Sequence, residues 1–569
     1  MLGRVRLLAI FIFLGFVIII SRLFYWQVIK AQTLSERVKF QHTRRGTINS
    51  QRGSILASDG TWMVTSERSW LLYAEPNKIE EADRVADKLS LIFSKDTDDR
   101  AGILEEASRV KNLLGNKKLY WVALKGRIDD VLKEKIEREE IDHLGFEEQE
   151  VRYYPEASMS AHLLGFVGKN SEGNDEGYFG LEGFYNNALT SKKGVRVGDF
   201  DIKGDPILTG DFSKISSIAG VDLLTNIDKT IQFYVDKNLE KGIAAYGAVQ
   251  GTAIVMDPKT GGILAMSNFP SYDPENYWNY SDNLFLNPTI SQSFEPGSVF
   301  KVVAMSSALD AGVVEPDTIC DLCFGPLHID KYTIGTWNDV YHPGSTMTQV
   351  IINSDNVGMA YVARRMGIER MITYLKKFKI GELTGIDLQG EMTPQLRPDR
   401  DWKEVDLLTS SFGQGIAVTP MQLTKAVAAI ANKGVMMKPQ VVKGVVIDNQ
   451  VNPIKPQSEG RIISPEAASK MTMMMVEAAK SGESKWTYLS GFKVAGKTGT
   501  AQIPVEGHYD AEKTIASFIG FAPYDDPKFV MLVTLKEPKS SQWASETAAP
   551  LWYSIAKELF FYFGMMPEK

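Results

Sequence analysis

Three short motifs contain the residue types that a site for acyl transfer needs. In chain order they are Ser298-Val299-Phe300-Lys301, Ser354-Asp355-Asn356 and Lys497-Thr498-Gly499-Thr500. A serine hydroxyl becomes a useful nucleophile when a base accepts its proton, and a lysine serves as that base when it is neutral. The motifs therefore predict a nucleophile, Ser298, a base, Lys301, and further hydroxyl, amide and cationic groups to hold a substrate.

Each motif alone is weak evidence, because the chain holds other copies of all three. These copies are the S-x-x-K tetrads at Ser108, Ser490 and Ser554, and the triplets Ser281-Asp282-Asn283 and Lys259-Thr260-Gly261. Ser281 precedes the nucleophile, and Lys259 lies in an Asp-Pro-Lys-Thr-Gly run that is typical of a turn between strands. We therefore assign the chemistry to the one set with the required order and long separations.

The spacing of Ser298 and Lys301 suits a helix. Residues 296–298 predict a turn that enters a helix over residues 299–309. Positions i and i+3 share one face of a helix, so we expect the amine of Lys301 near the hydroxyl of Ser298. The helix start also offers unpaired N–H groups to a developing negative charge. Lys301 must be neutral to act, and we expect Lys497 to be the cation that lowers its pKa. The alternative is a solvated lysine on a helix surface.

The second motif lies at a predicted helix entrance. Ser354 is expected to relay a proton between Lys301 and the leaving amine, and Asn356 to bind a substrate amide. The alternative is that Ser354 or Asn356 only caps the helix.

The third motif forms the second half of a strand predicted over residues 493–500, whose edge could bind an extended peptide. We expect Lys497, with the hydroxyl of Thr498 or Thr500, to hold a carboxylate. Gly499 has no side chain, which would let a ligand lie close against the strand. The backbone N–H groups of Ser298 and Thr500 are expected to form the oxyanion hole.

Other patterns predict the elements that position the motifs. A helix is predicted over residues 229–245, a hairpin over 252–256 and 262–266, strands over 514–521 and 528–535, and a final helix over 550–563. Antiparallel strands with helices before and after them indicate an α+β domain whose sheet is covered by helices on both faces.

Composition narrows the possible partners and cofactors. The 569 residues carry a net charge of −7 without a basic cluster, which argues against nucleic acid. Cys320 and Cys323 lie too far from a full ligand set for zinc, so we expect no metal and no cofactor. Two packed thiols are the default for this pair, and a local disulfide is the alternative.

Residues 7–29 form an apolar run long enough to span a bilayer, with Tyr25 and Trp26 at the outer interface. No cleavage site follows, which favours an uncleaved anchor. The basic flanks are ambiguous, but a large following domain can cross regardless of local charge, so we place the N-terminus in the cytoplasm. Arg22 lies inside the span, where it snorkels or faces a partner helix.

With these motifs, the chain resembles a class B penicillin-binding protein, a membrane-anchored D,D-transpeptidase of peptidoglycan. Residues 294–298 and 411–420 are similar to the septal, FtsI-type branch, and Arg52-Gly53, residues 152–155 and residues 180–183 resemble boxes of the family's non-catalytic pedestal. The family often has an acidic residue where this chain has Gln51, which puts an ion pair there in doubt. In the pedestal boxes we expect buried Arg–Glu pairs and glycine turns rather than catalysis.

The resemblance implies three parts: a cytoplasmic stub and transmembrane anchor (residues 1–29), a mixed pedestal (30–222) and a serine β-lactamase-like transpeptidase domain (223–569). It implies stem peptides and β-lactams as ligands, a cell-membrane location with the catalytic domain outside, and a polytopic glycan polymerase and other division proteins as partners. The rival hypotheses are a β-lactam hydrolase or sensor, and a division-complex scaffold with little catalysis.

Overall fold

The structure is a computed structural model that describes residues 2–34, 43–48, 50–94, 99–156, 159–192, 194–199, 213–215, 217–505 and 508–568. The chain forms two compact units, Met1–Arg52 with Thr190–Gly220 and Gly53–Leu189 with Val221–Lys569. The predicted division at residues 29/30 and 222/223 is a different partition and stays a prediction.

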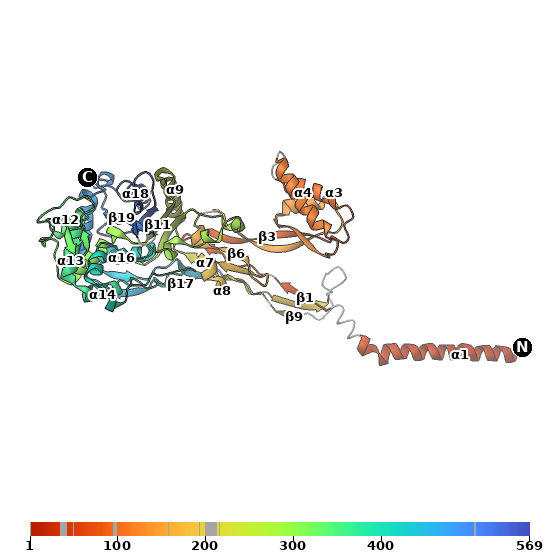
Figure 1. Ribbon diagram of the computed structural model, residues 1–569. Helices are drawn as coiled ribbons and strands as arrows, with labels where there is room; N and C mark the ends of the chain where they lie inside the picture. The colour runs from red at the N-terminus through yellow and green to blue at the C-terminus, as the bar shows by residue number, and fades with distance from the viewer. Residues whose placement is uncertain are drawn as a thin grey trace. The chain divides into compact units, whose positions relative to one another are not determined.

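The first unit contains a long helix and a small sheet. Helix α1 (Leu2–Phe24) continues into the π-helical segment η1 (Tyr25–Ile29), as Figure 1 shows, and none of its residues is buried. This stretch is long and apolar enough to cross a membrane. It is therefore compatible with the anchor predicted over residues 7–29. Strands β1 (Thr43–Ile48), β8 (Gly194–Asp199) and β9 (Ser213–Ile215) form an antiparallel sheet.

The second unit begins with a sheet to which distant parts of the chain contribute. Its strands follow the order β17-β16-β10-β2-β3-β4, and β5 also pairs with β3. They are β2 (Ile55–Leu56), β3 (Trp62–Ala74), β4 (Val122–Ile128), β5 (Leu144–Tyr153), β10 (Asp222–Thr225), β16 (Val442–Ile447) and β17 (Gln450–Pro453). Since β16 and β17 come from the C-terminal half of the sequence, this sheet joins the pedestal to the rest of the unit.

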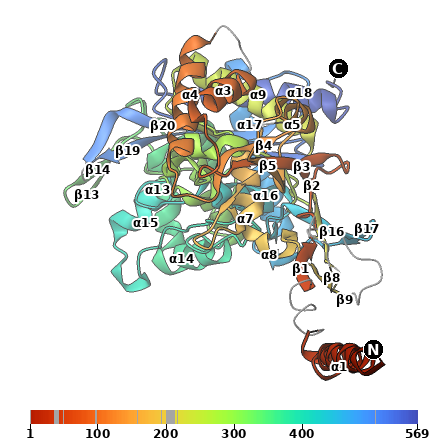
Figure 2. The ribbon, with the colours of Figure 1, turned by 90° about the vertical axis from the view of Figure 1, so that its right-hand side faces the viewer.

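Helices α3 (Ala82–Phe93), α4 (Arg100–Gly115) and α5 (Asp130–Glu137) belong to the same region as β3–β5, as Figures 1 and 2 show. Apolar side chains of these helices and strands form one buried cluster that includes Leu72, Leu89, Val110 and Leu124. This part of the unit thus has its own small core.

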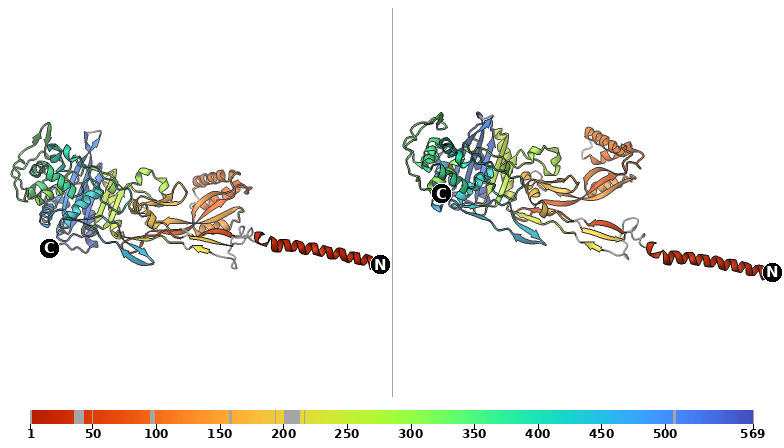
Figure 3. Two further views of the ribbon diagram at one scale, coloured as in Figure 1. Left: turned by 90° about the horizontal axis from the view of Figure 1, so that it is seen from below. Right: turned by 60° about the horizontal axis from the view of Figure 1, so that its bottom comes forward.

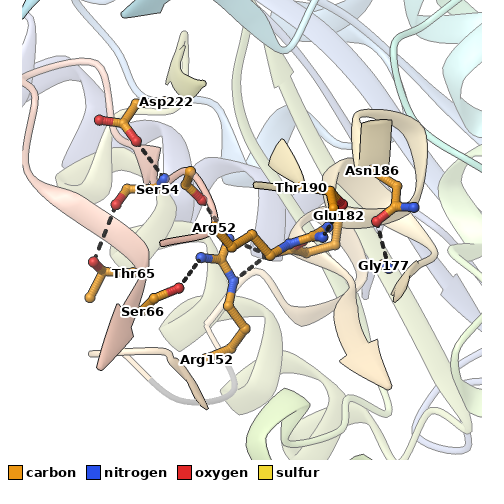
Figure 4. Close-up of polar contacts among 11 residues, drawn as sticks. Arg52, Ser54, Thr65, Ser66, Arg152, Gly177, Glu182, Asn186, Thr190 and Asp222 are labelled. Atoms are coloured by element: carbon orange, nitrogen blue, oxygen red, sulfur yellow. Dashed lines mark hydrogen bonds and ion pairs between the residues drawn. The ribbon is translucent and has the colours of Figure 1, made fainter. Parts of the chain in front are cut away.

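A buried ion pair holds the pedestal boxes together, as Figure 4 shows. The Nη2 atom of Arg152 lies 2.5 Å from Oε1 of Glu182, and both side chains are buried. The same guanidinium donates to Ser66 Oγ at 2.9 Å and to the carbonyl of Gly53 at 2.8 Å. The prediction of a buried Arg–Glu pair is confirmed, and further hydrogen bonds from the guanidinium help to compensate its burial.

The second sheet has five antiparallel strands in the order β12-β11-β21-β20-β19. These are β11 (Gln250–Met256), β12 (Ile263–Phe269), β19 (Ala495–Val505), β20 (His508–Ala522) and β21 (Phe529–Lys536). The expected hairpin and three later strands are confirmed. The Lys259-Thr260-Gly261 copy forms the turn between β11 and β12, where Gly261 has a φ of +82°.

Strand β21 is apolar at successive positions, without the usual alternation, because both of its faces are buried. Phe529, Met531, Val533 and Leu535 belong to one apolar cluster, whereas Val530 and Leu532 belong to another. The first cluster includes α9 (Lys229–Tyr246) and α18 (Ala548–Tyr562), and the second includes α11 (Lys301–Asp310), α16 (Pro420–Ala431) and α17 (Pro465–Ser481). Helices therefore cover both faces of the sheet, as Figure 3 shows.

Shorter elements complete the unit. They are α6 (Ala161–Leu164), α7 (Gly180–Phe184), α8 (Asn186–Leu189), α10 (Pro288–Ser291), α12 (Met347–Ile352), α13 (Asn356–Met366), α14 (Ile368–Lys377), α15 (Glu404–Ser410), β6 (Phe166–Lys169), β7 (Asp175–Tyr178), β13 (Leu327–Ile329), β14 (Tyr332–Ile334), β15 (Val435–Met437), β18 (Ser458–Arg461) and the 3₁₀ segments η2 (Pro274–Asn279), η3 (Asp282–Leu284), η4 (Gly297–Phe300), η5 (Asp399–Asp401) and η6 (Lys485–Thr487).

Cys320 and Cys323 form a disulfide, and both side chains are buried. The expectation of two packed thiols is therefore wrong, and the alternative of a local disulfide is confirmed. The chain turns between the two residues and brings their Cα atoms to 5.6 Å, inside the range that a disulfide spans. This turn could not be inferred from the spacing alone.

Candidate active site

Lys301 lies at the centre of the site and is completely buried. Its Nζ donates to the carbonyl oxygen of Ser354 at 2.5 Å and to Oδ1 of Asn356 at 2.8 Å, and lies 3.3 Å from Ser354 Oγ. The 3₁₀ turn η4 leads directly into α11, which begins at Lys301. The alternative of a solvated helix lysine is thus excluded.

The surroundings of Lys301 favour its neutral form. Burial, followed by the positive charge of Lys497, lowers its pKa to about 7, whereas the charges of Glu483 and Asp355 act in the opposite direction. A substantial fraction of the molecules therefore holds an unprotonated Lys301 near neutral pH, which is what a general base requires.

Ser298 lies in η4, one turn before Lys301, and is partly exposed. Its side chain makes no hydrogen bond to any residue that the structure describes. Gly297, just before it, has a φ of +57°, and its N–H donates to the carbonyl of Gly413 at 3.1 Å. A glycine is needed here because few other residues adopt this conformation. The segment around Gly413 thus fixes the backbone that presents the serine.

Gly499 places strand β19 against η4. A Cβ atom at this position would lie 2.9 Å from the Val299 nitrogen and 3.1 Å from the carbonyl oxygen of Pro296. The missing side chain is therefore required for the contact between the strand and the turn that carries Ser298. The structure gives this reason for Gly499, and close ligand approach at the strand stays a prediction.

Ser354 lies between the two lysines of the site. Its Oγ accepts a hydrogen bond from Lys497 Nζ at 2.9 Å and lies 3.3 Å from the amine of Lys301. Its φ of +53° is unusual for a serine, and its side chain is only 2% exposed. A hydroxyl in this place can pass a proton between neighbouring groups, as a relay requires.

Asp355, rather than Ser354 or Asn356, caps helix α13. Its side chain accepts from the N–H groups of Val357 and Gly358 at 2.8 and 3.1 Å. The capping alternative is therefore wrong for both neighbours. The Oδ1 atom of Asn356 accepts a hydrogen bond from Lys301 Nζ, and its Nδ2 donates to the carbonyl oxygen of Gly335 at 3.1 Å. The amide holds Lys301 in place, and its expected contact with a substrate amide stays a prediction.

Lys497 is 3% exposed and donates to Ser354 Oγ and to Oγ1 of Thr498, the latter at 3.1 Å. Burial lowers the pKa of Lys497, and the charge of Glu483 opposes this effect. Thr500 Oγ1 accepts from the N–H of Ala544 at 3.0 Å. The structure therefore brings all three motifs together at one end of strand β19.

The motifs did not include Glu483, which accepts a hydrogen bond from Thr498 Oγ1 at 2.8 Å. The motifs also did not reveal that Gly413 packs against Gly297. Neither residue stands in a pattern with chemical meaning, although Gly413 does lie in the 411–420 segment singled out for its resemblance.

The chain matches the model of the penicillin binding protein transpeptidase domain over residues 251–559, more than half of its length. It belongs to the penicillin-binding protein transpeptidase family. A penicillin-binding protein dimerisation domain matches residues 47–225. This pair of domains, together with relatives named FtsI and PenA, identifies a class B penicillin-binding protein of FtsI type, as the motifs predicted.

Relatives of this penicillin-binding protein match it along most of their length. Stage V sporulation protein D from Bacillus subtilis is 29% identical over all of this chain and 87% of its own. Peptidoglycan D,D-transpeptidase FtsI from Escherichia coli is 27% identical over 97% of this chain and 90% of its own. The crystal structure of penicillin binding protein 2X from Streptococcus thermophilus is similar with a TM-score of 0.73 and 25% identity, covering 92% of this chain and 80% of that one. The predicted fold class is thus confirmed.

Proposed function

We propose that this penicillin-binding protein is a peptidoglycan D,D-transpeptidase that crosslinks stem peptides through an acyl-enzyme on Ser298. The observation that carries the proposal is the buried Lys301, whose pKa of about 7 and contacts with the second motif suit a general base. Relatives named peptidoglycan D,D-transpeptidase support the same reaction.

The reaction divides into two acyl transfers. Ser298 attacks the carbonyl of the terminal D-Ala–D-Ala bond while Lys301 accepts the hydroxyl proton. The C–N bond breaks, and the leaving D-Ala amine takes a proton through Ser354. The amine of a neighbouring stem peptide then attacks the ester, forms the new amide and releases Ser298 with its proton restored. A β-lactam enters the first step only and leaves a long-lived adduct.

The remaining motif residues bind the donor peptide. Lys497 and the Thr500 hydroxyl hold its carboxylate, while the peptide lies along β19 at Gly499. The N–H groups of Ser298 and Thr500 stabilise the oxyanion. Thr498 stands next to this carboxylate site, and Asn356 keeps Lys301 oriented.

The protein acts at the cell membrane in septal wall synthesis. The apolar helix Leu2–Ile29 supplies a single-pass anchor with its N-terminus in the cytoplasm and the catalytic domain outside. Its partners are a polytopic glycan polymerase and other division proteins, with Arg22 available to a partner helix in the membrane.

Intact mass spectrometry tests the assignment on the full-length protein in detergent. Benzylpenicillin is expected to add one stable adduct to the wild type and to Ser108→Ala, which alters another S-x-x-K tetrad, but none to Ser298→Ala. An adduct on Ser298→Ala would refute Ser298 as the nucleophile. A transient adduct with drug turnover would favour a β-lactam hydrolase, and no adduct on any protein would favour a scaffold.

A further inference from the structure

Glu483 is a carboxylate at the edge of the active site that none of the three motifs contains. It follows helix α17 and is half-buried, and its Oε2 accepts the hydrogen bond from Thr498 Oγ1 at 2.8 Å. The backbone beside it is closely packed, since a Cβ atom on Gly482 would lie 3.0 Å from the carbonyl oxygen of Ile352. The backbone just before Glu483 therefore packs against the end of α12, two residues before Ser354.

The groups around Thr498 determine the direction of its hydrogen bonds. A carboxylate cannot donate, so the single hydroxyl proton of Thr498 points to Glu483. The Thr498 oxygen then accepts from the ammonium of Lys497 at 3.1 Å. Thr500 differs, because its Oγ1 accepts from the Ala544 N–H and keeps its own proton for another acceptor. Of the two threonine hydroxyls, only that of Thr500 is thus ready to donate to a ligand.

A ligand carboxylate beside Lys497 meets two obstacles. The Thr498 hydroxyl proton is already held by a charged acceptor, so it is lost to the ligand, and a carboxylate that approaches Lys497 also approaches a second negative charge. We propose that Glu483 is a specificity-determining residue, which competes with the ligand carboxylate for Thr498 and Lys497 and so weakens the binding of carboxylate-bearing donors and β-lactams. This inference rests on the transpeptidase site proposed above.

Glu483 has a second effect, through the two lysines. The groups whose charges act on Lys301 are Lys497 on β19, Glu483 after α17 and Asp355 at the start of α13. The negative charge of Glu483 raises the pKa of Lys301 and of Lys497. Removing it lowers both, so Lys301 becomes a base at lower pH and Lys497 loses its proton at lower pH.

The first test compares benzylpenicillin with its methyl ester on the full-length protein, because only the acid carries a carboxylate. Rates of adduct formation are measured for wild type, Glu483→Gln, Glu483→Asp and Glu477→Gln. The acid-to-ester rate ratio is expected to rise about tenfold in Glu483→Gln, since one close like charge is lost. It should stay unchanged in Glu477→Gln, a matched control just upstream in α17 whose charge acts on Tyr488.

The second readout is the pH profile of acylation. The rate rises with pH as Lys301 loses its proton and falls at higher pH as Lys497 loses its own. In Glu483→Gln both the rising and the falling limb are expected to move to lower pH by roughly one unit, whereas Glu483→Asp keeps the charge and the wild-type limbs. A purely structural role would lower the rate at every pH without moving a limb, and that result would overturn the inference. So would an unchanged acid-to-ester ratio. If wild type forms no Ser298 adduct, the proposed function itself fails, whereas a normal wild-type adduct with an unaltered Glu483→Gln ratio and profile refutes only the role of Glu483.

Discussion

Acylation of Ser298 by benzylpenicillin is expected to be about tenfold slower at pH 6 than at pH 8, because Lys301 must lose its proton before it can act as a base. Burial and the charge of Lys497 lower the pKa of Lys301 to about 7. With that pKa, about a tenth of the molecules hold a neutral Lys301 at pH 6 and about nine tenths at pH 8. The rate should therefore rise with pH through 7 and level off above 8.

The sign and position of this limb distinguish a buried base from an ordinary lysine. An unperturbed lysine, with a pKa near 10.4, would be neutral in only about one molecule in 250 at pH 8, and the rate would keep rising up to about pH 10. The drug carboxylate stays ionised throughout this range, so the limb reports on the protein. Lys301→Arg is a useful comparison, because a guanidinium keeps its proton and should cost at least roughly a hundredfold in rate at every pH.

The assay is quenched-flow mixing of full-length protein with benzylpenicillin, followed by intact mass, at half-unit steps from pH 5.5 to 9. The second-order rate constant is taken from the adduct fraction at several drug concentrations. A rate constant that is flat between pH 6 and 8, or that is still rising tenfold per pH unit at pH 9, would refute Lys301 as the base with the protonation behaviour described here.

Three further perturbations follow from the packing and the charges. Gly499→Ala should slow acylation at least about tenfold and lower the free energy of unfolding by roughly 1–3 kcal/mol, because the new methyl group meets the turn that carries the nucleophile; Gly115→Ala, where a Cβ meets nothing within 4 Å, is the control in both a thermal melt and the acylation assay. Glu182→Gln should lower the free energy of unfolding by about 3–5 kcal/mol in a denaturant titration, since it removes the carboxylate charge that lies against the buried guanidinium of Arg152, and an unchanged midpoint would contradict this reading. Asn356→Asp should move the acylation limb to higher pH, because a carboxylate 2.8 Å from Lys301 favours its charged form, and a limb at the wild-type position would show that this contact is absent in solution.

The parts that could be predicted from the sequence are those whose signal lies in consecutive residues. The apolar run of β21 and the Asp-Pro-Lys-Thr-Gly turn before β12 each reflect their immediate surroundings, and both lie where the residues indicated. The three motifs were recognisable because their order and residue types are specific together, although other copies of each exist. The positions of five of the eight predicted site residues are tied by hydrogen bonds among themselves: Lys301, Ser354, Asn356, Lys497 and Thr498.

The reasons for individual residues were harder to predict, because they depend on which segments meet. Gly499 was expected to admit a ligand, yet its missing side chain faces Val299 on the neighbouring turn. Ser354 and Asn356 had a capping alternative, and the structure gives that duty to Asp355 between them. In each case the residue type suits several structural roles, and the tertiary contacts determine which role the residue has.

Glu483 shows most clearly where sequence reasoning ends. It lies 14 positions before Lys497 in a segment without a motif, and its neighbours indicate only the end of a helix. Its importance comes from the contact with Thr498, which puts a negative charge beside two buried lysines. The positive charges of Lys301 and Lys497 repel each other in this buried site, so the protonation of each lysine depends on a nearby carboxylate. The protonation state of the base is therefore a property of the assembled site, in which a residue outside every motif has a direct part.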